Sequence, residues 1–369
     1  MTVVGVVGGG QLARMMIPSA INLGLEIRVF AEGKDSPAAI AATQVGDYRN
    51  LGALQKFARE VDVLTFDHEH VPTDVLVALR NADVTVAPSP EALALTHDKI
   101  VMRTALSEMG APQPRWAVLE GSDDPAHALQ QVGGFPCIAK KPIGGYDGKG
   151  VRVIDSLSQV EDWLELGPVL LEERVSFVRE LALLSARREG GQWVSWPPVE
   201  TRQRDGVCAE VIAPAPGTSD SQNEQARALA GSLAEQIGVV GVLAVEVFEQ
   251  PDGSLLVNEL AMRPHNSGHV FTELSVTSQF EQHLRAVADL TLGASALLAP
   301  AGVMVNIFGS LTDESVAAGL EADPRVKIHN YSKTARDGRK VGHAVLLGES
   351  SDETLVQAQH VREVIHGSR

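Results

Sequence analysis

The sequence has few cysteines and no long apolar run. Of its 369 residues, only Cys137 and Cys208 are cysteines, and neither lies in a C-x-x-C or mixed Cys/His spacing. This scarcity excludes a zinc ribbon or a disulfide framework as the basis of the fold, and it favours a reducing, cytoplasmic compartment. No stretch of about 20 apolar residues is present to span a membrane. Because MTVVGVVGGG lacks a basic region before an apolar run, we expect no signal peptide.

Basic residues are also in a minority. There are 31 Lys and Arg against 47 Asp and Glu, a formal net charge of -16. A general nucleic-acid binder needs a basic face, so this balance argues against nucleic-acid partners. Hydrophobic residues make up 44% of the chain, enough for a sizeable core. The length predicts two or three domains.

The pattern of apolar runs changes along the chain. Over residues 1–95, short β-branched runs alternate with helical patterns, which predicts an α/β, Rossmann-like domain with an open parallel sheet. Residues 96–295 read as α+β with many antiparallel strands. Residues 296–369 read as a small β-rich domain that ends in a helix. No internal repeat interrupts this order.

The first candidate site is Gly8-x-Gly10-x-x-Ala13, which follows the first predicted strand. Glycines at a strand-to-helix turn let backbone N–H groups approach a phosphate. One interpretation is a dinucleotide site, with Glu32 binding a ribose. Another is a tight turn that packs the helix on the sheet. Gln11 at the head of the helix also suits a phosphosugar.

The second candidate is the loop from Lys140 to Gly150, with the sequence KKPIGGYDGKG. It is no Walker A loop, because G-x-x-x-x-G-K-[ST] is absent. Glycine-rich hairpin loops with a lysine at the tip fold over polyphosphates and exclude water. Lys140 ends an apolar strand, so its ammonium should face whatever the loop covers. The alternative is an ordinary hairpin.

The third candidate joins two apolar strands. Glu246 lies in VLAVEVF and Asn258-Glu259 in LLVNELA, on either side of a turn. A hairpin centred on that turn places 246 opposite roughly 258, so the carboxylates should be neighbours. Close carboxylates repel each other unless a cation lies between them, and oxygen ligands suit Mg²⁺. The alternative is a pair on the solvent face of an edge hairpin.

Two polar clusters complete the set. The segment RPHNSGH, residues 263–269, is too polar for a core and too chemically varied for a plain loop. It predicts an oxyanion site beside a γ-phosphate. His265 and His269 have the i, i+4 spacing of a zinc pair on a helix, but Pro264 and Gly268 argue against a helix. Residues 331–343 form the densest basic cluster, which favours a pocket for a phosphate monoester over a solvated turn.

Together these segments resemble the ATP-grasp ligases, and among them the purine-biosynthesis ligases that carboxylate aminoimidazole ribonucleotide. The resemblance runs through nearly the whole chain, and its most specific motifs are GGYDGKG and RPHNSGH in this order. It implies an ATP-grasp fold with an N-terminal preATP-grasp domain and a mobile subdomain at about 112–175. It also implies ATP and Mg²⁺ as cofactors, and aminoimidazole ribonucleotide and bicarbonate as substrates. A homodimer is also implied.

The resemblance also implies site residues. ATP would lie between two antiparallel sheets. Its binding positions would be Lys99, Lys140, Gly145, Tyr146, Asp147, Gly148, Lys149, Gly150, Glu172, Glu173, Arg174, Val175, Glu180, Gln203, Asn258 and Glu259. The positions that would meet aminoimidazole ribonucleotide are Gln11, Leu12, Glu69, Tyr146, Lys333, Arg339 and Lys340. Glu246 and Glu259 would hold the metal. The implied catalytic residues, around bicarbonate, are Asp147, Arg263, His265 and Asn266.

The chain departs from the family pattern at a few positions. Asp67 stands where a Glu is usual, His97 where Gln is usual, and Met262 where Pro is common. Gln203 occupies a stretch that often has His or Asn, so its role stays open. The expected reaction is bicarbonate attack on the γ-phosphate, followed by attack of an amine on carboxyphosphate. Alternatives are a related ligase, such as a formate-dependent glycinamide ribonucleotide transformylase or a biotin carboxylase, an NAD(P)-dependent oxidoreductase, and a non-catalytic nucleotide-binding protein.

Overall fold

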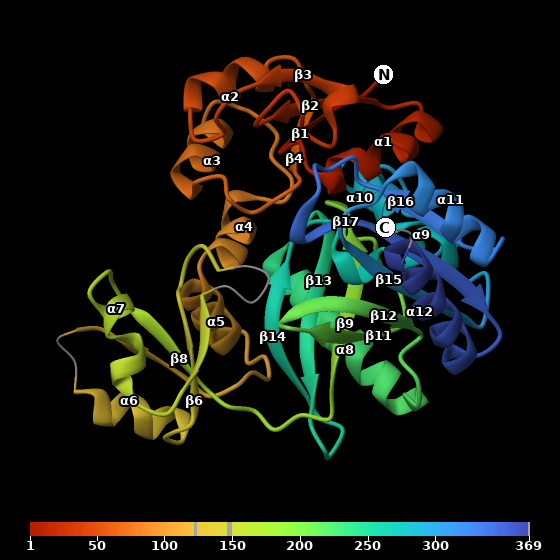
Figure 1. Cartoon of the computed structure of the whole chain (residues 1–369). Helices are drawn as coiled ribbons and strands as arrows, with labels where there is room; N and C mark the ends of the chain where they lie inside the picture. The colour runs from red at the N-terminus through yellow and green to blue at the C-terminus, as the bar shows by residue number, and fades with distance from the viewer. Residues whose placement is uncertain (122–123, 146–149, 368–369) are drawn as a thin grey trace.

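The computed structural model describes residues 1–121, 124–145 and 150–367, and its strands form three sheets (Figure 1). The first is the predicted open parallel sheet. Its strand order is β3-β2-β1-β4, and its strands are β1 (Val3–Val7), β2 (Glu26–Ala31), β3 (Ala42–Val45) and β4 (Val63–Phe66). The apolar run VTVA at 84–87 predicts a further strand. This prediction is wrong, because only Val86 forms a bridge there, to Leu64.

A helix follows each strand of this sheet. These helices are α1 (Gln11–Leu23), α2 (Leu51–Ala58) and α3 (Thr73–Arg80), with the short η1 (Ala39–Ala41) before β3. Gly24 ends α1 in the left-handed conformation, with φ of 67°, which glycine adopts without a Cβ penalty. The Asn50 side chain caps α2 by accepting a hydrogen bond from the Ala53 N–H.

The sequence pattern over residues 91–109 predicts one helix, but the structure has two, α4 (Pro90–His97) and α5 (Lys99–Glu108). Asp98 breaks it, because its carboxylate accepts hydrogen bonds from the N–H groups of Ile100 and Val101 at 2.8 and 3.3 Å. An Asp in this role starts a new helix rather than continuing the old one. The break makes Lys99 the first residue of α5.

A separate lobe contains the second sheet, with order β5-β8-β6-β7 and antiparallel pairing throughout (Figure 1). Its strands are β5 (Trp116–Leu119), β6 (Cys137–Lys140), β7 (Val151–Ile154) and β8 (Val169–Glu173). Its helices are α6 (Pro125–Val132), η2 (Leu157–Val160) and α7 (Glu161–Leu164). The lobe has its own apolar cluster around Leu119, Trp163 and Leu171.

The third sheet carries the rest of the chain. Its order is β14-β13-β9-β11-β12-β15-β17-β16, with β10 beside β9. Its strands are β9 (Arg179–Arg187), β10 (Trp193–Ser195), β11 (Val199–Arg204), β12 (Val207–Ala213), β13 (Gly241–Glu249), β14 (Leu255–Ala261), β15 (Ala301–Gly309), β16 (Lys327–Asn330) and β17 (Arg336–Gly348). Because β12 pairs with β15, the last three strands extend the same sheet.

The remaining helices pack around this sheet. They are α8 (Asp220–Ile237), η3 (Asn266–Gly268), α9 (Phe271–Leu274), α10 (Gln279–Val287), α11 (Asp313–Ala322) and α12 (Ser351–Gly367). Phe280 and Leu284 of α10 share an apolar cluster with Leu12 and Met16 of α1, which joins the N-terminal sheet to the body. None of the helices in the described ranges combines the length and apolar character needed to cross a bilayer.

Candidate active site

The predicted carboxylate pair lies on β13 and β14. Glu246 pairs directly with Glu259, and Val247 pairs with Val257, so Asn258 is the extra residue of a β-bulge. The residue opposite Glu246 is therefore Glu259, one position beyond the partner expected from the turn, which was roughly 258. Residues directly opposite share one face of a sheet, so both carboxylates face the same side. Burial, together with the nearby charge of Glu259, raises the pKa of Glu246 to about 7.

Two lysines from different parts of the chain meet this hairpin. Lys99 Nζ lies 2.9 Å from Glu259 Oε1. Lys140 Nζ, at the end of β6, lies 3.1 Å from Asn258 Oδ1. Both lysines are mostly buried, with 8% of each residue exposed. The two predicted phosphate-binding ammonium groups thus lie next to the predicted metal carboxylate and amide.

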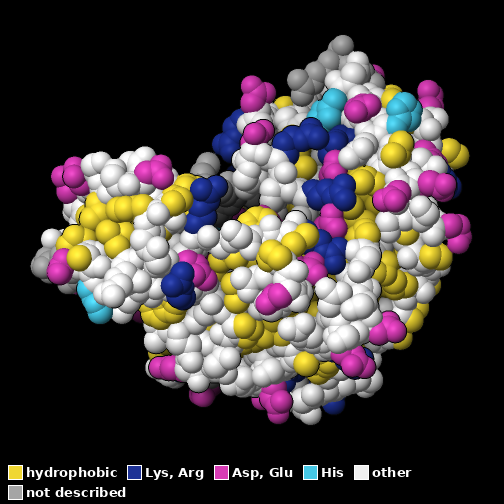
Figure 2. All heavy atoms as spheres, turned by 90° about the horizontal axis from the view of Figure 1, so that it is seen from below, with side chains coloured by type: hydrophobic (Ala, Val, Ile, Leu, Met, Phe, Trp, Pro, Cys, Tyr) yellow, Lys and Arg dark blue, Asp and Glu magenta, His cyan; other side chains and the backbone are white. Residues whose placement is uncertain are grey.

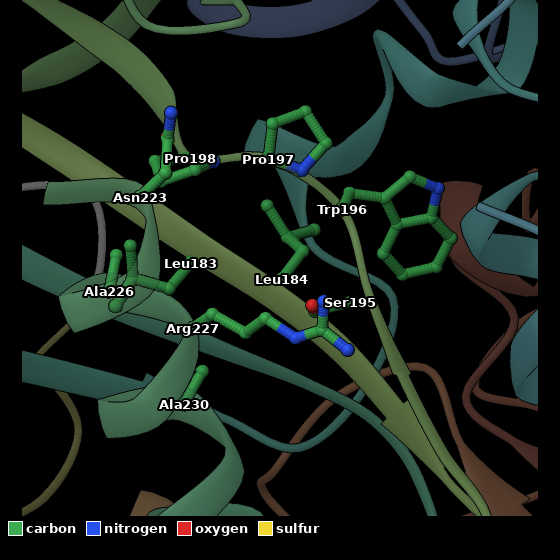
Figure 3. Close-up of a pocket in the computed structure, with 10 residues that line it drawn as sticks. All are labelled: Leu183, Leu184, Ser195, Trp196, Pro197, Pro198, Asn223, Ala226, Arg227 and Ala230. Atoms are coloured by element: carbon green, nitrogen blue, oxygen red, sulfur yellow. The ribbon is translucent and has the colours of Figure 1, made fainter. Parts of the chain in front are cut away.

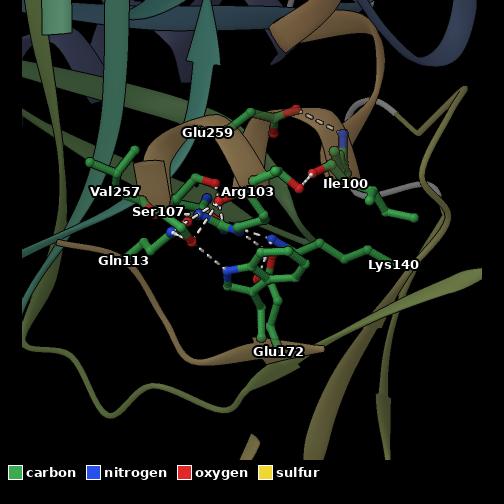
Figure 4. Close-up of polar contacts among 12 residues, drawn as sticks. Ile100, Arg103, Ser107, Gln113, Lys140, Glu172, Val257 and Glu259 are labelled. Atoms are coloured by element: carbon green, nitrogen blue, oxygen red, sulfur yellow. Dashed lines mark hydrogen bonds and ion pairs between the residues drawn. The ribbon is translucent and has the colours of Figure 1, made fainter. Parts of the chain in front are cut away.

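Arg103 is a residue of this site that the sequence analysis missed (Figure 4). It is fully buried, and its Nε lies 2.7 Å from Glu172 Oε1. Its other nitrogens donate to the carbonyl oxygens of Val257 and Asn258, both at 2.8 Å. A possible signal was its position four residues after Lys99, which places both on one face of α5.

Glu172 holds both cations. Its Oε2 lies 2.8 Å from Lys140 Nζ, while its Oε1 pairs with Arg103. Burial opposes the charged form, but Lys140 and Arg103 outweigh it and keep the pKa of Glu172 below its ordinary value. The carboxylate predicted to line the adenine is therefore occupied by protein partners in this structure.

The predicted nucleoside-binding residues lie where the lobe joins the body. Glu173 ends β8, Arg174 and Val175 follow it, and Glu180 lies at the start of β9. Gln203 Nε2 donates to Glu180 Oε2 at 2.9 Å, across the β9–β11 pair. Burial raises the pKa of Glu180. The structure thus gives Gln203 a concrete contact, which the sequence left open.

The RPHNSGH segment lies against the carboxylate pair. His265 Nε2 is 3.5 Å from Glu246 Oε1, and Arg263 Nε is 2.8 Å from Glu69 Oε2. This ion pair joins a predicted bicarbonate residue to a predicted ribonucleotide residue. Burial lowers the pKa of His265 to about 3, so the ring is neutral at physiological pH.

The two histidines of this segment are hydrogen-bonded to other side chains and are not arranged as a zinc pair. His265 Nδ1 is 2.8 Å from Ser267 Oγ, and His269 Nδ1 is 2.8 Å from Gln279 Nε2. Among the residues that the structure describes, no group of three or more His, Cys, Asp or Glu is placed to hold a metal. Asn266 exchanges two hydrogen bonds with Asn306, at 3.0 and 2.8 Å, which orients its amide.

The N-terminal glycine turn is occupied by the protein's own carboxylates. Asp67 accepts hydrogen bonds from the N–H groups of Gly10 and Ala13, at 2.7 and 2.8 Å. Glu32 accepts one from Gly9 at 3.0 Å. A Cβ on Gly10 would lie 2.0 Å from Asp67 Oδ2, so the close approach requires glycine. Because these are the donors a pyrophosphate would use, the dinucleotide interpretation fails here.

The predicted phosphate pocket combines the start of α1 with β17. Gln11 is the first residue of α1, whereas Leu12 is 3% exposed and its side chain lies in the core. Lys333 Nζ lies 5.4 Å from the centre of the Tyr331 ring. Arg339 donates to the Thr334 carbonyl at 3.2 Å, and Lys340 lies on the same strand. Leu12 therefore offers a ligand only its backbone.

The tip of the glycine loop lies outside the described residues. These are Tyr146, Asp147, Gly148 and Lys149. The base of the loop is described: β6 and β7 pair from Cys137–Ile154 to Lys140–Val151, and the Lys141 N–H donates to the Gly150 carbonyl at 2.9 Å. The predicted hairpin is therefore confirmed at its base, with Gly145 and Gly150 on either side of the tip.

Two views show hollows in the molecule. Figure 2 shows a face hollowed between the smaller lobe and the body, with Lys and Arg side chains along its edge. Figure 3 shows a separate cavity of about 200 Å³ between α8 and the strand segments around Leu183 and Trp196. That cavity is lined mainly by apolar side chains, and no predicted site residue is among them. The carboxylate pair and its lysines, rather than this cavity, carry the candidate chemistry.

Comparisons with known proteins agree with this geometry. Residues 1–97 match the ribonucleotide synthetase preATP-grasp domain, residues 104–280 the ATP-grasp domain, and residues 302–357 the phosphoribosylaminoimidazole carboxylase C-terminal domain. An N5-carboxyaminoimidazole ribonucleotide synthase of Mycobacterium tuberculosis is 46% identical, over 96% of this chain and 86% of that protein.

Solved structures show the same fold. A crystal structure of an ADP complex of N5-carboxyaminoimidazole ribonucleotide synthetase has a TM-score of 0.91 and 32% identity, covering 100% of this chain and 98% of that one. The Aspergillus clavatus synthase in complex with ADP and 5-aminoimidazole ribonucleotide has a TM-score of 0.88 and 30% identity, covering 99% of each chain.

Proposed function

The chain belongs to the N5-carboxyaminoimidazole ribonucleotide synthases, and from this premise we propose how its residues perform the reaction. It is an ATP-dependent carbon–nitrogen ligase that acts on 5-aminoimidazole ribonucleotide. One observation carries the mechanism: Lys99 and Lys140 both contact the β13–β14 hairpin, on which Glu246 and Glu259 lie opposite each other. The finer assignments, of bicarbonate, Mg²⁺ and individual residues, are our proposals.

The donor set suits Mg²⁺. Glu246 and Glu259 present two carboxylates on one face, and the Asn258 Oδ1 lies beside them on the bulge. The raised pKa of Glu246 indicates that its negative charge lacks full compensation from the protein. A bound Mg²⁺ would supply that compensation and would neutralise phosphate charge during transfer. We propose that Glu246 and Glu259 hold it, together with phosphate oxygens of ATP.

Phosphoryl transfer needs cations fixed in place before the reaction. Lys140 is held between Glu172 and Asn258, and Lys99 is held on Glu259, so neither ammonium has to be ordered when ATP binds. An oxygen of bicarbonate attacks the γ-phosphorus, the bond to the β-phosphate oxygen breaks, and ADP leaves. We propose that both lysines stabilise the charge on the transferring group.

Bicarbonate would lie beside the 263–269 segment. The Arg263 guanidinium supplies a fixed positive charge, and His265 is a neutral ring. Because the Ser267 N–H donates to His265 Nδ1 at 3.4 Å, the ring proton is on Nε2, where it serves as a hydrogen-bond donor. Arg263 and His265 would therefore bind the oxyanion and orient it toward the γ-phosphate.

The second step forms the carbon–nitrogen bond. The exocyclic amine of the ribonucleotide attacks the carbon of carboxyphosphate, or the CO₂ it releases, and phosphate is the leaving group that takes up the amine proton. Glu69 is the group we propose for the ribose, because its ion pair with Arg263 places it at the bicarbonate segment. Carboxyphosphate hydrolyses readily, so water must be kept away from it until the amine attacks.

An ADP-release assay tests the proposal. Wild-type protein with ATP, Mg²⁺ and bicarbonate should release ADP faster when 5-aminoimidazole ribonucleotide is present, and formate should not replace bicarbonate. The same mixture with glycinamide ribonucleotide and formate serves as the comparison. Faster ADP release with formate would assign the chain to a different ATP-grasp reaction.

Other parts of the proposal rest on the family resemblance. The homodimer and the cytoplasmic location stay predictions. The domain boundaries at 95/96 and 295/296, with the subdomain at about 112–175, are also proposals. The lobe formed by β5 to β8 supports the last of these, since it has its own sheet and its own apolar cluster.

A further inference from the structure

A buried chain of side chains connects the bicarbonate segment to the basic segment that follows β16. Its members are Gln279, His269, His343 and Tyr331, and each is at most 1% exposed. None of them has a role in the reaction described above. Buried polar groups of this kind are costly unless they are hydrogen-bonded, so their arrangement requires a physical explanation.

Gln279, the first residue of α10, fixes the bicarbonate segment. Its Oε1 accepts a hydrogen bond from the His265 N–H, and its Nε2 donates to the His265 carbonyl, both at 2.8 Å. The same Nε2 lies 2.8 Å from His269 Nδ1. A Cβ on Gly268 would lie 2.4 Å from Gln279 Oε1, so the segment passes this amide too closely for any side chain there.

These contacts also set the state of His269. A backbone N–H is always a donor and a backbone carbonyl always an acceptor, so the two bonds to His265 fix which end of the Gln279 amide is nitrogen. The second N–H of Gln279 therefore donates to His269 Nδ1. His269 must then be neutral, with its proton on Nε2.

The His269 ring contacts β17, the last strand of the chain. It stacks on His343 of β17, with ring centres 4.8 Å apart and an angle of 25° between the planes. His343 Nδ1 is 2.8 Å from the Tyr331 hydroxyl. Tyr331 lies two residues before Lys333, and its ring lies under the Lys333 ammonium. The chain of contacts thus ends at a proposed phosphate ligand.

A second contact ties the same two segments together. Asn306 of β15 is paired with His343 in the β15–β17 register and is fully buried. Its side chain exchanges two hydrogen bonds with Asn266 and also donates to the Cys208 carbonyl at 2.9 Å. The C-terminal strands therefore hold the bicarbonate segment at two points, Asn266 and His269.

We propose that Gln279, His269, His343 and Tyr331 are positioning residues that hold the bicarbonate segment and the phosphate-binding segment at one fixed separation. The inference rests on the proposed function, since it concerns the approach of the ribonucleotide amine to the activated carboxyl group. An error of about 1 Å in such an approach lowers a rate by roughly a hundredfold. The network supplies rigidity where two substrates must meet.

Tyr331→Phe is the sharpest test, because it removes one hydroxyl and keeps the ring. We expect the KM for 5-aminoimidazole ribonucleotide to rise about three- to tenfold, the effect of losing one buried hydrogen bond. The KM for ATP should stay within about twofold of wild type on the same scale. The ratio of ADP formed to carboxylated ribonucleotide formed should also rise, because misplaced amine leaves carboxyphosphate to hydrolyse.

Gln279→Leu tests the other end of the network. It should also raise the KM for 5-aminoimidazole ribonucleotide and leave the KM for ATP nearly unchanged. Gln279→Glu should not restore wild-type behaviour, because a carboxylate cannot donate to His269 Nδ1. The matched control is Ser275→Ala, which removes a buried hydroxyl whose partners are Phe271, Thr277 and Trp196. That control should change neither KM nor the product ratio.

The experiment separates failure of the inference from failure of the proposed function. If wild type shows no ribonucleotide-stimulated ADP release, the proposed function fails and the inference fails with it. If wild type is active and both KM values are unchanged in Tyr331→Phe, or rise together, only the inference is overturned. A ¹⁵N NMR spectrum showing a protonated His269 Nδ1 in wild type would overturn it without an activity assay.

Discussion

Lys140 and Glu172 lie on neighbouring strands of the small sheet and form a buried ion pair of 2.8 Å. Glu172 is itself held by Arg103, which reaches across to the backbone of β14. The pair therefore joins the small lobe to the hairpin that carries Glu246 and Glu259. It places the Lys140 ammonium, which we propose binds phosphate, against that hairpin.

Removing Arg103 should destabilise the protein and also disturb Lys140. In Arg103→Met the buried Glu172 keeps only one cation, and breaking a buried pair in this way costs about 3–5 kcal/mol. We expect a loss of that order in the free energy of unfolding, measured by urea denaturation. Arg103→Lys should lose less, because it keeps a charge for Glu172 and gives up the fork of hydrogen bonds.

The control for that comparison is Arg59→Met, a change at the exposed C-terminus of α2. It should leave the urea midpoint almost unchanged. Equal midpoints for wild type and Arg103→Met would contradict the role assigned to the buried pair.

Glu259→Gln should nearly abolish ADP formation while leaving the fold intact. The change removes a proposed metal ligand and the negative partner of Lys99, but it conserves the volume of the side chain. We expect a loss in rate of at least about a hundredfold, since metal stabilisation of the transferring phosphate is worth several kcal/mol. The rate is measured at saturating ATP and Mg²⁺, with circular dichroism to verify folding.

Glu60→Gln, a substitution of a carboxylate that pairs with Arg28 far from the hairpin, is the matched control for Glu259→Gln. It should retain wild-type turnover. Normal turnover in Glu259→Gln itself would refute the metal assignment.

Much of the local structure follows from the sequence, and the exceptions have physical causes. The ends of α1 were predictable, because Gly10 and Gly24 bound an amphipathic run that continues through Pro18. The break at Asp98 was missed, since the apolar pattern continues through it and only the capping side chain ends the helix. The β11–β12 hairpin was missed because its turn end, at Gln203 and Arg204, is polar and lacks alternation.

The site was predicted by residue type better than by contact. Glu246, Glu259 and Lys140 stand out as polar groups beside apolar runs, whereas Lys99 came only from the family resemblance. The structure brings all four together. The bulge at Asn258 could not be foreseen, because register depends on both strands at once. The only sign of Arg103 in the sequence is its spacing of four residues from Lys99. Its role becomes visible only in the structure, where Glu172 from a distant strand forms an ion pair with it.

Metal affinity should fall as the pH drops below about 7. Glu246 has a pKa of about 7 in the folded protein against an ordinary value of 4.5, so between these values the folded state carries a proton that the unfolded chain lacks. Mg²⁺ must displace this proton, so binding weakens as the pH falls through 7. The check is the Mg²⁺ concentration for half-maximal ADP release, measured from pH 6 to pH 8.

The same raised pKa makes a prediction for stability. Above pH 7 the charged Glu246 opposes folding, and this penalty disappears as the pH falls from about 7 to 4.5. Without Mg²⁺, Glu246→Gln should therefore be more stable than wild type at pH 8, by about 1 kcal/mol after allowing for solvent screening. The difference should vanish near pH 5. A variant less stable than wild type at pH 8 would contradict the assignment.

Gln203 should affect ATP more than the ribonucleotide. Its amide donates to Glu180, and without that bond the carboxylate loses a partner that lowers its raised pKa. We expect Gln203→Leu to raise the KM for ATP about three- to tenfold, the effect of losing one ordinary hydrogen bond, because this contact is exposed to solvent. The KM for 5-aminoimidazole ribonucleotide, measured in parallel, should hardly change. A rise confined to the ribonucleotide KM would place Gln203 in a different site.

The N-terminal glycine turn should not bind a dinucleotide. Asp67 already accepts the N–H groups of Gly10 and Ala13, so it occupies the position of a pyrophosphate at the head of α1. NADH titrated into wild type to about 1 mM, a thousandfold weaker than a typical micromolar site, should show no saturable change in nicotinamide fluorescence. ATP added under the same conditions should bind, and saturable NADH binding would restore the oxidoreductase interpretation.

The same contact should stabilise α1, because Asp67 supplies from a distant strand the cap that Gly10 cannot provide. Asp67→Ala leaves two helix N–H groups without their acceptor, which typically costs about 0.5–2 kcal/mol. Burial raises the pKa of Asp67, and the hydrogen bond from the Ala13 N–H offsets part of this desolvation penalty. The urea midpoint of Asp67→Ala should fall, whereas Asp35→Ala, a change in the nearby surface turn, should leave it unchanged. An unchanged midpoint in Asp67→Ala would mean that the turn needs no anion at all, and the occupied amides would no longer argue against a dinucleotide.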